Sequence, residues 1–351
     1  MRKRILFYVR KGNGLGHLRR LTRIAARLSE SYSCLFVSSH PEMSWFVPDT
    51  CEYYFMPELD KNFRSQFLLH MEQLYQPGLI FLDHSVNGND EDVQAMLYQS
   101  KAIKIMVLRG VLDSPAKVKD IYLNSKSRKI INALIDHIVV ACDERIIDIT
   151  NYGFLDKNAV KRIKYVGYVA PPQKVREIKK TGIVRVVCSP GGGYRNYHLL
   201  NIGKELAGIY KDETFWKIVY GPKNNKAFDY YPYNSFVKDN CNFISFDKDT
   251  DQLHLNSDIM VSKGGYNNLI EGISGGSFII CKPTGAKNDE QYIHSTRLSK
   301  YYDKILIANT FNEVRDQFKN VMTNRLYTKN SNTDLNMDGV ENIYSLVKNS
   351  I

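Results

Sequence analysis

Arg4-Ile5-Leu6-Phe7-Tyr8-Val9 is a short apolar run, and Gly12-Asn13-Gly14-Leu15-Gly16-His17 follows it closely. A helical pattern of apolar residues then extends from His17 to Leu28. A strand, a glycine loop and a helix in this order begin a βαβ unit, which builds a parallel sheet. The glycines allow a sharp turn and let backbone N–H groups approach a ligand at the start of the helix. The stretch therefore predicts an α/β fold with a ligand-binding first loop.

The same succession occurs again in the second half of the chain. Val184–Cys188 is strand-like, and Ser189-Pro190-Gly191-Gly192-Gly193-Tyr194 supplies the glycines. A tight strand-to-helix turn is the alternative interpretation of this loop. Strand-like runs alternate with helical patterns in both halves, and the further strands that we expect are Cys34–Ser38, Leu79–Leu82, Lys104–Leu108, His137–Ala141, Trp216–Tyr220, Asn242–Ser245, Ile259–Ser262 and Phe278–Cys281.

The length of 351 residues exceeds what one hydrophobic core usually serves. Prolines and charges between Ala170 and Lys180 interrupt the alternation and predict a linker at residues 170–181. We therefore expect an N-terminal domain at 1–169 and a C-terminal domain at 182–351. Both should be Rossmann-like, doubly wound parallel-sheet α/β domains that face a cleft.

Composition favours a globular protein of the cytoplasm. Hydrophobic residues make up 43% and charged residues 24% of the chain, and no apolar run approaches the ~20 residues that span a bilayer. The basic N-terminus lacks the apolar segment of an export signal. The six cysteines and eight histidines are dispersed, so we expect reduced thiols and no metal site.

The net charge of +11 permits nucleic acid, an anionic membrane surface or a phosphorylated substrate as partner. The sequence signatures of nucleic-acid-binding modules are missing, so we expect no nucleic acid. Dinucleotide binding is disfavoured too. The third glycine of G-x-G-x-x-G would fall at His17, and no acidic residue follows the second strand, where Ser38-Ser39-His40 stand.

A third glycine loop, Ser262-Lys263-Gly264-Gly265-Tyr266-Asn267-Asn268, directly follows the strand Ile259–Ser262. Two glycines and two amide side chains at a helix start suit phosphate or sugar hydroxyls. Glu271, one turn further on, could accept two hydrogen bonds from a ribose diol. A glycine-softened helix start with a solvent-facing glutamate is the alternative.

The block Asp258–Leu298, which contains this loop, Glu271, Pro283 and Asp289-Glu290-Gln291, resembles the C-terminal donor site of family 28 (MurG-like) glycosyltransferases. The first loop, Gly14-Leu15-Gly16-His17-Leu18-Arg19-Arg20, is similar to the G-x-G-H-x-x-R opening of that group. Three further segments have near counterparts in predicted glycosyltransferases of this kind: Leu108–Asp113, Asp143–Ile146 and Val166–Val169. The resemblance covers nearly the whole chain.

The resemblance implies the two-domain GT-B fold, with acceptor binding in the N-terminal domain and donor binding in the C-terminal one. It also implies metal-independent, inverting transfer from a nucleotide sugar, UDP-linked rather than dTDP-linked, with no cofactor. The implied donor-binding residues are Gly14, Gly16, Gly191, Gly192, Gly193, Phe246, Lys263, Gly264, Gly265, Tyr266, Asn267, Asn268, Glu271, Glu290 and Gln291. The run Asp247-x-Asp249-x-Asp251 could suggest a metal-dependent transferase, but the resemblance places it on the loop beside the nucleobase. The three carboxylates could also form a solvated turn or a helix cap.

Glycosyl transfer also needs a base for the acceptor hydroxyl. His17 is the first candidate, because imidazole titrates near neutral pH. Asp83 and His84 are the others, because strand ends line the crevice of such sheets. His17 could alternatively donate to phosphate or only shape its loop.

The acceptor is expected to be a glycan, a lipid-linked sugar or a small molecule. Arg19, Arg20 and Arg23, on the helix after the first loop, could bind an anionic acceptor or the inner face of the membrane; a solvated face is the alternative. A nucleotide-sugar hydrolase, an epimerase and a non-catalytic partner subunit are the rival functions.

Overall fold

The computed structural model describes residues 2–11, 15–88, 90–172, 182–191, 197–221, 240–244, 250–283, 289–329 and 333–351. The chain divides into two compact domains. The first contains His17–Val169, the strand that precedes it, and Asn336–Ile351. The second contains Ala170–Leu335.

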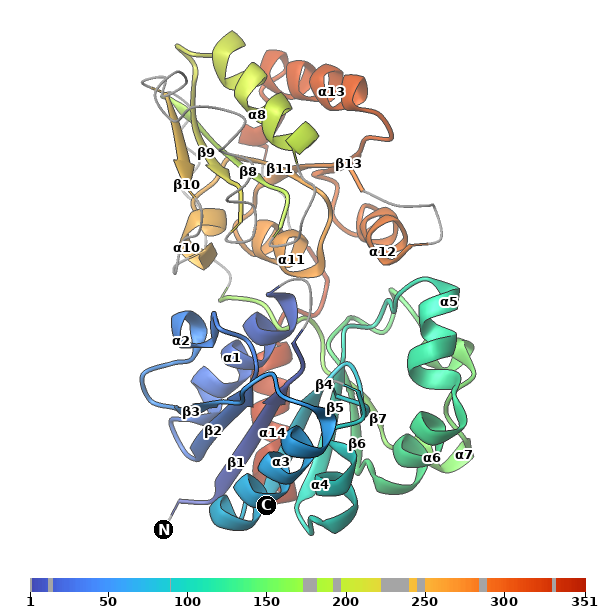
Figure 1. Ribbon diagram of the computed structural model, residues 1–351. Coiled ribbons are helices and arrows are strands. Elements are labelled where there is room, and N and C mark those ends of the chain that lie inside the picture. Colours follow the sequence, from blue (N-terminus) through green and yellow to red (C-terminus); the bar gives the residue numbers. More distant parts are fainter. Residues whose placement is uncertain are drawn as a thin grey trace. The chain divides into compact units, whose positions relative to one another are not determined.

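The first domain is built on a seven-stranded parallel sheet (Figure 1). Its spatial order is β3-β2-β1-β4-β5-β6-β7. The strands are β1 (Arg4–Val9), β2 (Ser33–Ser38), β3 (Glu52–Phe55), β4 (Leu79–Asp83), β5 (Ile103–Leu108), β6 (His137–Val140) and β7 (Ile163–Tyr165). The central strands are almost continuously apolar and buried, as expected for a parallel sheet with helices on both faces. Phe7 stacks on Phe36 and on Phe81, with ring centroids 4.7 and 4.9 Å apart, and joins β2, β1 and β4.

The helices of this domain follow the strands in alternation. They are α1 (Gly16–Leu28), α2 (Met43–Phe46), α3 (Lys61–Tyr75), α4 (Gln94–Gln99), α5 (Pro115–Val118), α6 (Ser125–Leu134), α7 (Lys157–Val160) and α14 (Gly339–Ser350), with a π-helix η1 (Lys119–Leu123) and a 3-10 helix η2 (Ile149–Tyr152). Helix α1 buries Leu18, Leu21, Ile24 and Leu28, the apolar stripe at helical spacing that the sequence showed.

The C-terminal helix α14 belongs to the first domain and lies beside α1 (Figure 1). Ile343 and Val347 on α14 are fully buried, and Arg27 of α1 donates from Nε to Glu341 at 2.7 Å. A bridge between Val169 and Asp338 joins the end of the first domain to the returning chain. The expected C-terminal domain of residues 182–351 is therefore wrong at its end. The apolar face of α14 is covered by a sheet far away in the sequence, which a local pattern does not show.

The second domain contains a six-stranded parallel sheet in the order β10-β9-β8-β11-β12-β13. The strands are β8 (Val184–Ser189), β9 (Thr214–Val219), β10 (Cys241–Ile244), β11 (Ile259–Ser262), β12 (Phe278–Cys281) and β13 (Ile305–Ile307). Trp216, fully buried, donates from Nε1 to Thr214 at 2.8 Å and packs against Phe318 at 5.2 Å between ring centroids. The indole is therefore buried with its polar atom satisfied.

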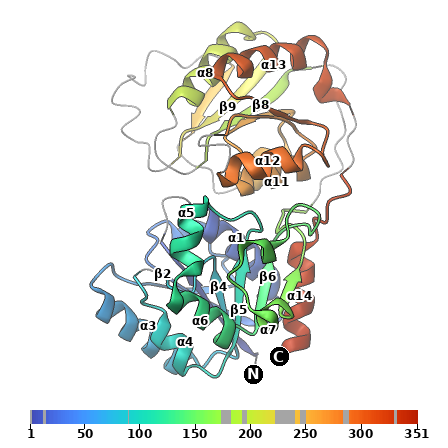
Figure 2. The same cartoon turned by 90° about the vertical axis from the view of Figure 1, so that its right-hand side faces the viewer.

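Helices cover both faces of this sheet (Figure 2). The described helices are α8 (Tyr197–Ile209), α10 (Thr250–Leu255), α11 (Tyr266–Ser274), α12 (Glu290–Leu298) and α13 (Phe311–Thr323), with a 3-10 turn η4 (Leu326–Thr328). Helices α8 and α13 pack on the face that carries Trp216. Leu253 of α10 packs on the opposite face, against Val187 and Val219. The prediction of two doubly wound parallel-sheet domains is confirmed.

Among the described residues, no helix has the length and apolar character needed to cross a membrane.

Ile343→Ala should lower the free energy of unfolding by about 2–5 kcal/mol, because it empties a fully buried site between α14 and the first sheet. Ile209→Ala is the matched control, since that isoleucine is 63% exposed, and its effect should stay within about 0.5 kcal/mol. Urea unfolding followed by fluorescence measures both. Equal effects of the two substitutions would contradict the assignment of α14 to the first domain's core.

Candidate active site

Each sheet reverses its strand order once, and the polar residues of interest gather at these two places. In the first sheet the reversal lies between β1 and β4, and in the second between β8 and β11. Ligands of open parallel sheets bind outside the carboxyl ends of the strands at such a reversal. Asp83 ends β4, while Ser189 and Ser262 end β8 and β11 and are paired in register.

His17 and Asp83 form a hydrogen-bonded pair in the first domain. Nδ1 of His17 lies 2.8 Å from Oδ2 of Asp83. The carboxylate is fully buried, while the side chain of His17 is 21% exposed. Because an ionised carboxylate only accepts, Nδ1 carries the hydrogen, and the lone pair of the neutral ring is on Nε2. This is the geometry of a general base oriented by a carboxylate.

Arg20, three residues after His17 on α1, pairs with Asp83 as well. Its guanidinium donates to both oxygens of Asp83, at 2.6 and 2.8 Å from Nη2. Burial alone would raise the pKa of Asp83, but the charge of Arg20 and the hydrogen bond from His17 lower it to about 2. Asp83 is thus an ionised partner of His17, not itself a base for neutral pH. The prediction that Arg20 contacts the acceptor or an anionic surface is wrong in this structure, because Arg20 is 2% exposed and pairs with Asp83.

The other two arginines of the predicted row differ from Arg20. Arg19 lies over the ring of Phe46, 5.9 Å from its centroid. Arg23 approaches the carbonyl of Val169 from Nη1 at 3.4 Å. Arg19 and Arg23 are only partly buried, so the predicted contact with an anionic acceptor or surface stays a prediction for these two residues.

His84 has both ring nitrogens engaged. Tyr122 lies 2.8 Å from Nδ1, and Oδ2 of Asp113 lies 3.3 Å from Nε2. Asp113 accepts, so Nε2 carries the hydrogen and the hydroxyl of Tyr122 donates to Nδ1. Burial lowers the pKa of His84 to about 3, against the opposing effect of Asp113. His84 has no lone pair for a substrate, and this argues against it as the base. Its ring centroid lies 5.1 Å from that of His17, so it packs beside the candidate base.

Sequence reasoning missed the residues that surround His84. Arg109 follows β5 directly and pairs with Asp113 at 2.9 Å. Burial would raise the pKa of Asp113, but the hydrogen bond from His84 and the charge of Arg109 hold it well below its usual range. The position of Arg109 could have predicted its place in the cluster, because it follows the carboxyl end of β5, the strand next to β4.

The N-terminus of α11 is the centre of the second cluster. Gly264 has a φ of +79°, and a Cβ there would lie 2.5 Å from Sγ of Cys281, so only glycine fits. Gly265 is the cap residue, and it offers no side-chain oxygen to the first turn. A Cβ at Gly265 would meet no atom within 4 Å. The space beside the cap residue Gly265 is therefore open, and the N-terminus of a helix favours an anion there.

Asn268 ties the two strand ends together beneath this helix start. Its Nδ2 donates to the carbonyl of Ser189 at 2.8 Å and to Oγ of Ser262 at 3.3 Å. Oγ of Ser262 also accepts from the backbone N–H of Gly264 at 3.2 Å. The amide nitrogen of Asn268, predicted to bind the donor, is thus used to hold the loop in shape.

Tyr266 turns away from the open side of the loop. It is 5% exposed, and its ring stacks on His294 of α12 at 5.7 Å with an interplanar angle of 11°. The ring of Tyr266 is therefore enclosed between α11 and α12, and a donor contact at this position is left to the backbone of the helix start. Asn267, the next residue of the first turn, is partly exposed.

Two lysines stand at the carboxyl edge of this sheet. Lys263 directly follows β11, and Lys282 directly follows β12. Burial lowers the pKa of Lys263, and the charge of Lys282 adds to the effect. Nζ of Lys282 donates to the carbonyl of Pro283 at 3.1 Å and lies over the ring of Phe311. Sequence reasoning identified Lys263 and missed Lys282, although both follow a strand of the same sheet.

Glu290 and Gln291 are the first two residues of α12, and both are partly exposed. The backbone carbonyl of Gln291 would lie 3.6 Å from a Cβ at Gly264, so the first turn of α12 borders the glycine loop. The structure thus brings the predicted sugar-reading pair next to the start of α11.

Glu271 is 1% exposed, and its carboxylate is hydrogen-bonded to Nδ1 of His254. The alternative of a solvent-facing glutamate is therefore wrong. Of the other predicted residues, Gly16 begins α1 and Gly191 lies beyond the end of β8. Gly14, Gly192, Gly193, Phe246, Asp247 and Asp249 lie outside the described residues.

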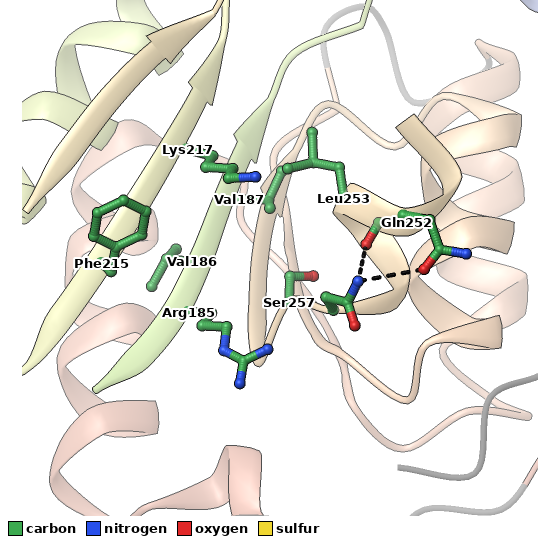
Figure 3. A pocket seen from close by; sticks show the side chains of 9 residues that line it. Arg185, Val186, Val187, Phe215, Lys217, Gln252, Leu253 and Ser257 are labelled. Carbon is green, nitrogen blue, oxygen red and sulfur yellow. Dashed lines mark hydrogen bonds between the residues drawn. The ribbon is translucent and has the colours of Figure 1, made fainter. Parts of the chain in front are cut away.

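A cavity of about 500 Å³ lies between α10 and the strands β8 and β9 (Figure 3). Arg185, Lys217 and Phe215 border it from the sheet, and Gln252 and Leu253 border it from α10. It contains none of the residues that the sequence predicted for the donor.

No family model matches the chain, and no curated protein matches it in sequence. Solved structures match it over its full length. The UDP-GlcNAc 2-epimerase from Neisseria meningitidis bound to UDP-GlcNAc has a TM-score of 0.63 at 14% identity, covering 100% of this chain and 99% of that one. A glycosyltransferase from Rickettsia africae has a TM-score of 0.59 at 14% identity, covering 99% and 94%. The calicheamicin glycosyltransferase CalG4 has a TM-score of 0.57 at 12% identity, covering 100% and 98%.

The chain has the GT-B fold. At these identities the likeness shows the fold alone. Glycosyltransferases and epimerases share this fold, so the GT-B frame does not choose between their reactions. The resemblance to family 28 stays a prediction.

His84→Asn should make the free energy of unfolding less dependent on pH. The unfolded histidine binds a proton near pH 6.5, and the folded one only near pH 3. Below about pH 6.5 the unfolded state therefore holds more protons, and stability falls by about 1.4 kcal/mol per pH unit from this residue. Asparagine tolerates the positive φ of 69° at this position and does not titrate.

Urea unfolding between about pH 7 and about pH 5 measures the slope. His70→Asn, on the exposed side of α3, is the matched control and should leave the slope unchanged. A variant slope identical to that of the unchanged protein would show that His84 is not buried in its neutral form.

Proposed function

We propose that this protein transfers a sugar from a UDP-linked donor to a hydroxyl of an acceptor. The reaction is metal-independent and inverts the anomeric carbon, because a deprotonated acceptor attacks the donor directly. The second domain binds the nucleotide, and the first domain supplies the base.

The N-terminus of α11 is the observation that carries the donor site. The space beside its cap residue Gly265 is open, and Lys263 directly follows the strand that leads into this helix. A helix N-terminus favours negative charge, which here is the diphosphate. The leaving diphosphate gains charge as the bond to the sugar breaks, so oriented N–H groups and cations lower the barrier without a metal ion. Glu290 and Gln291, beside Gly264, are placed to read donor-sugar hydroxyls.

The pair His17 and Asp83 supports catalysis by a base. Asp83 is held ionised by Arg20 and His17, and Nδ1 of His17 is bonded to it. The remaining nitrogen can take the acceptor's proton, and Asp83 stabilises the imidazolium that forms. No nucleophilic side chain is needed, because the acceptor oxygen itself attacks the anomeric carbon as the diphosphate leaves.

Lys263→Ala should weaken UDP binding by about tenfold or more, because a hydrogen bond to a charged group contributes about 1.5–3 kcal/mol. Calorimetric titration with UDP in the presence of EDTA measures the affinity. Lys211→Ala, an exposed lysine of the same domain, is the control and should bind UDP as before. Unchanged affinity in Lys263→Ala would remove Lys263 from the site. Binding that EDTA abolishes and manganese restores would contradict the metal-free mechanism.

His17→Asn should lower turnover by about 10²–10⁴-fold and leave UDP affinity unchanged. The amide nitrogen of asparagine can replace Nδ1 as a donor to Asp83, whereas the base nitrogen is lost. Turnover is followed as UDP release from a panel of UDP-sugars and dTDP-glucose with candidate acceptors. His70→Asn serves again as the control. A parallel loss of affinity and turnover would assign His17 to phosphate binding, and full turnover would end its role.

A UDP-sugar epimerase is the second candidate, because the Neisseria meningitidis 2-epimerase matches the chain at least as well as the two transferases do. Incubation with UDP-GlcNAc alone separates the two functions. An epimerase would convert the donor without an acceptor, and a hydrolase would release free sugar. The proposed transferase leaves most of the donor intact until an acceptor is added.

A further inference from the structure

His254 and Glu271 form a buried pair between α10 and α11. His254 is fully buried and Glu271 is 1% exposed. Nδ1 of the histidine is hydrogen-bonded to Oε2 of the glutamate. A carboxylate closed off from water stays ionised only if a neighbouring group donates to it. His254 provides such a donor from α10.

The backbone around His254 is fixed by two buried serines. Its carbonyl accepts from Oγ of Ser257 at 2.9 Å and from Oγ of Ser277 at 3.4 Å. Oγ of Ser277 also donates to the carbonyl of Ser257 at 2.8 Å. The end of α10 is thereby tied to the segment before β12. These hydrogen bonds fix the backbone position from which the His254 side chain extends.

Gly275, which ends α11, lets the two helices approach closely. A Cβ there would lie 2.8 Å from Cα of Leu255 and 2.9 Å from the carbonyl of His254. Any side chain at this position would push α10 away from α11. The short distance between the backbones is what allows the short imidazole side chain to reach Glu271.

The second ring nitrogen of His254 is enclosed as well. Within the described residues, Nε2 has no hydrogen-bond partner, although no solvent reaches it. Because a carboxylate only accepts, Nδ1 of His254 is the donor to Glu271.

We propose that His254 is a positioning residue for the donor's ribose. It holds the Glu271 carboxylate ionised and in one orientation, in which it accepts hydrogen bonds from the ribose hydroxyls when the nucleotide occupies the start of α11. The inference rests on the proposed donor site.

The test compares UDP with 2′-deoxy-UDP, since only a contact with the ribose distinguishes them. The unchanged protein should prefer UDP by about tenfold or more, the value of one hydrogen bond to a charged group. Glu271→Ala and His254→Leu should each reduce this preference to near unity, and the double variant should lose no more. His254→Asn should keep most of the preference, because its amide nitrogen stands where Nδ1 stood.

Gln252→Ala is the control on the same helix. Gln252 borders the cavity between α10 and the sheet (Figure 3), and its side chain accepts from Asn256, so this change alters α10 and leaves His254 in place. The preference for UDP should persist. If His254→Leu does not fold, His254→Gln replaces it, because its amide lies near the position of Nε2 and should not rescue.

Two other outcomes separate the proposals. If Glu271→Ala loses the preference and His254→Leu keeps it, the role of His254 is wrong and the donor site stands. If Glu271→Ala keeps the preference, Glu271 does not contact the ribose, and the inference and this part of the donor site fail together. Loss of UDP binding in Lys263→Ala would still support the diphosphate site.

Discussion

The reversal of strand order in each sheet is the constraint on which both clusters depend. Between β1 and β4, and again between β8 and β11, neighbouring strands send their connections to opposite faces. The carboxyl ends of the two strands are left uncovered at that point. Asp83 and His17 meet at the first reversal, and Ser189, Ser262 and the start of α11 meet at the second. The same sheet topology therefore positions two different sets of polar residues.

Electrostatics distinguishes the two places. The cluster at the first reversal contains a buried carboxylate that is paired with Arg20 and hydrogen-bonded to a partly exposed imidazole, an arrangement that suits proton transfer. The cluster at the second reversal contains the N-terminus of α11 and two lysines, an arrangement that suits an anion. Neither cluster alone specifies a reaction. A proton acceptor together with a diphosphate site is what transfer from a nucleotide sugar requires.

The sequence predicted the central strands of both sheets but not β3, β7 and β13. All three lie at a sheet edge: β3 is exposed along its whole length, and β7 and β13 are only three residues long, too short for a recognisable apolar run. Glycine spacing located the start of α11, because only glycine suits the backbone at Gly264. The pairs Arg20–Asp83 and His254–Glu271 join residues 63 and 17 positions apart, and only the fold shows such partners.

Hydrogen exchange of the chain with and without UDP tests most directly the claim that the start of α11 binds the nucleotide. Backbone amides of residues 264–268 should exchange more slowly when UDP is present, since the diphosphate accepts from the first turn of the helix. The core strands of the first sheet should be unaffected. Protection confined to the first domain, or to the cavity beside α10, with none at residues 264–268, would contradict the account.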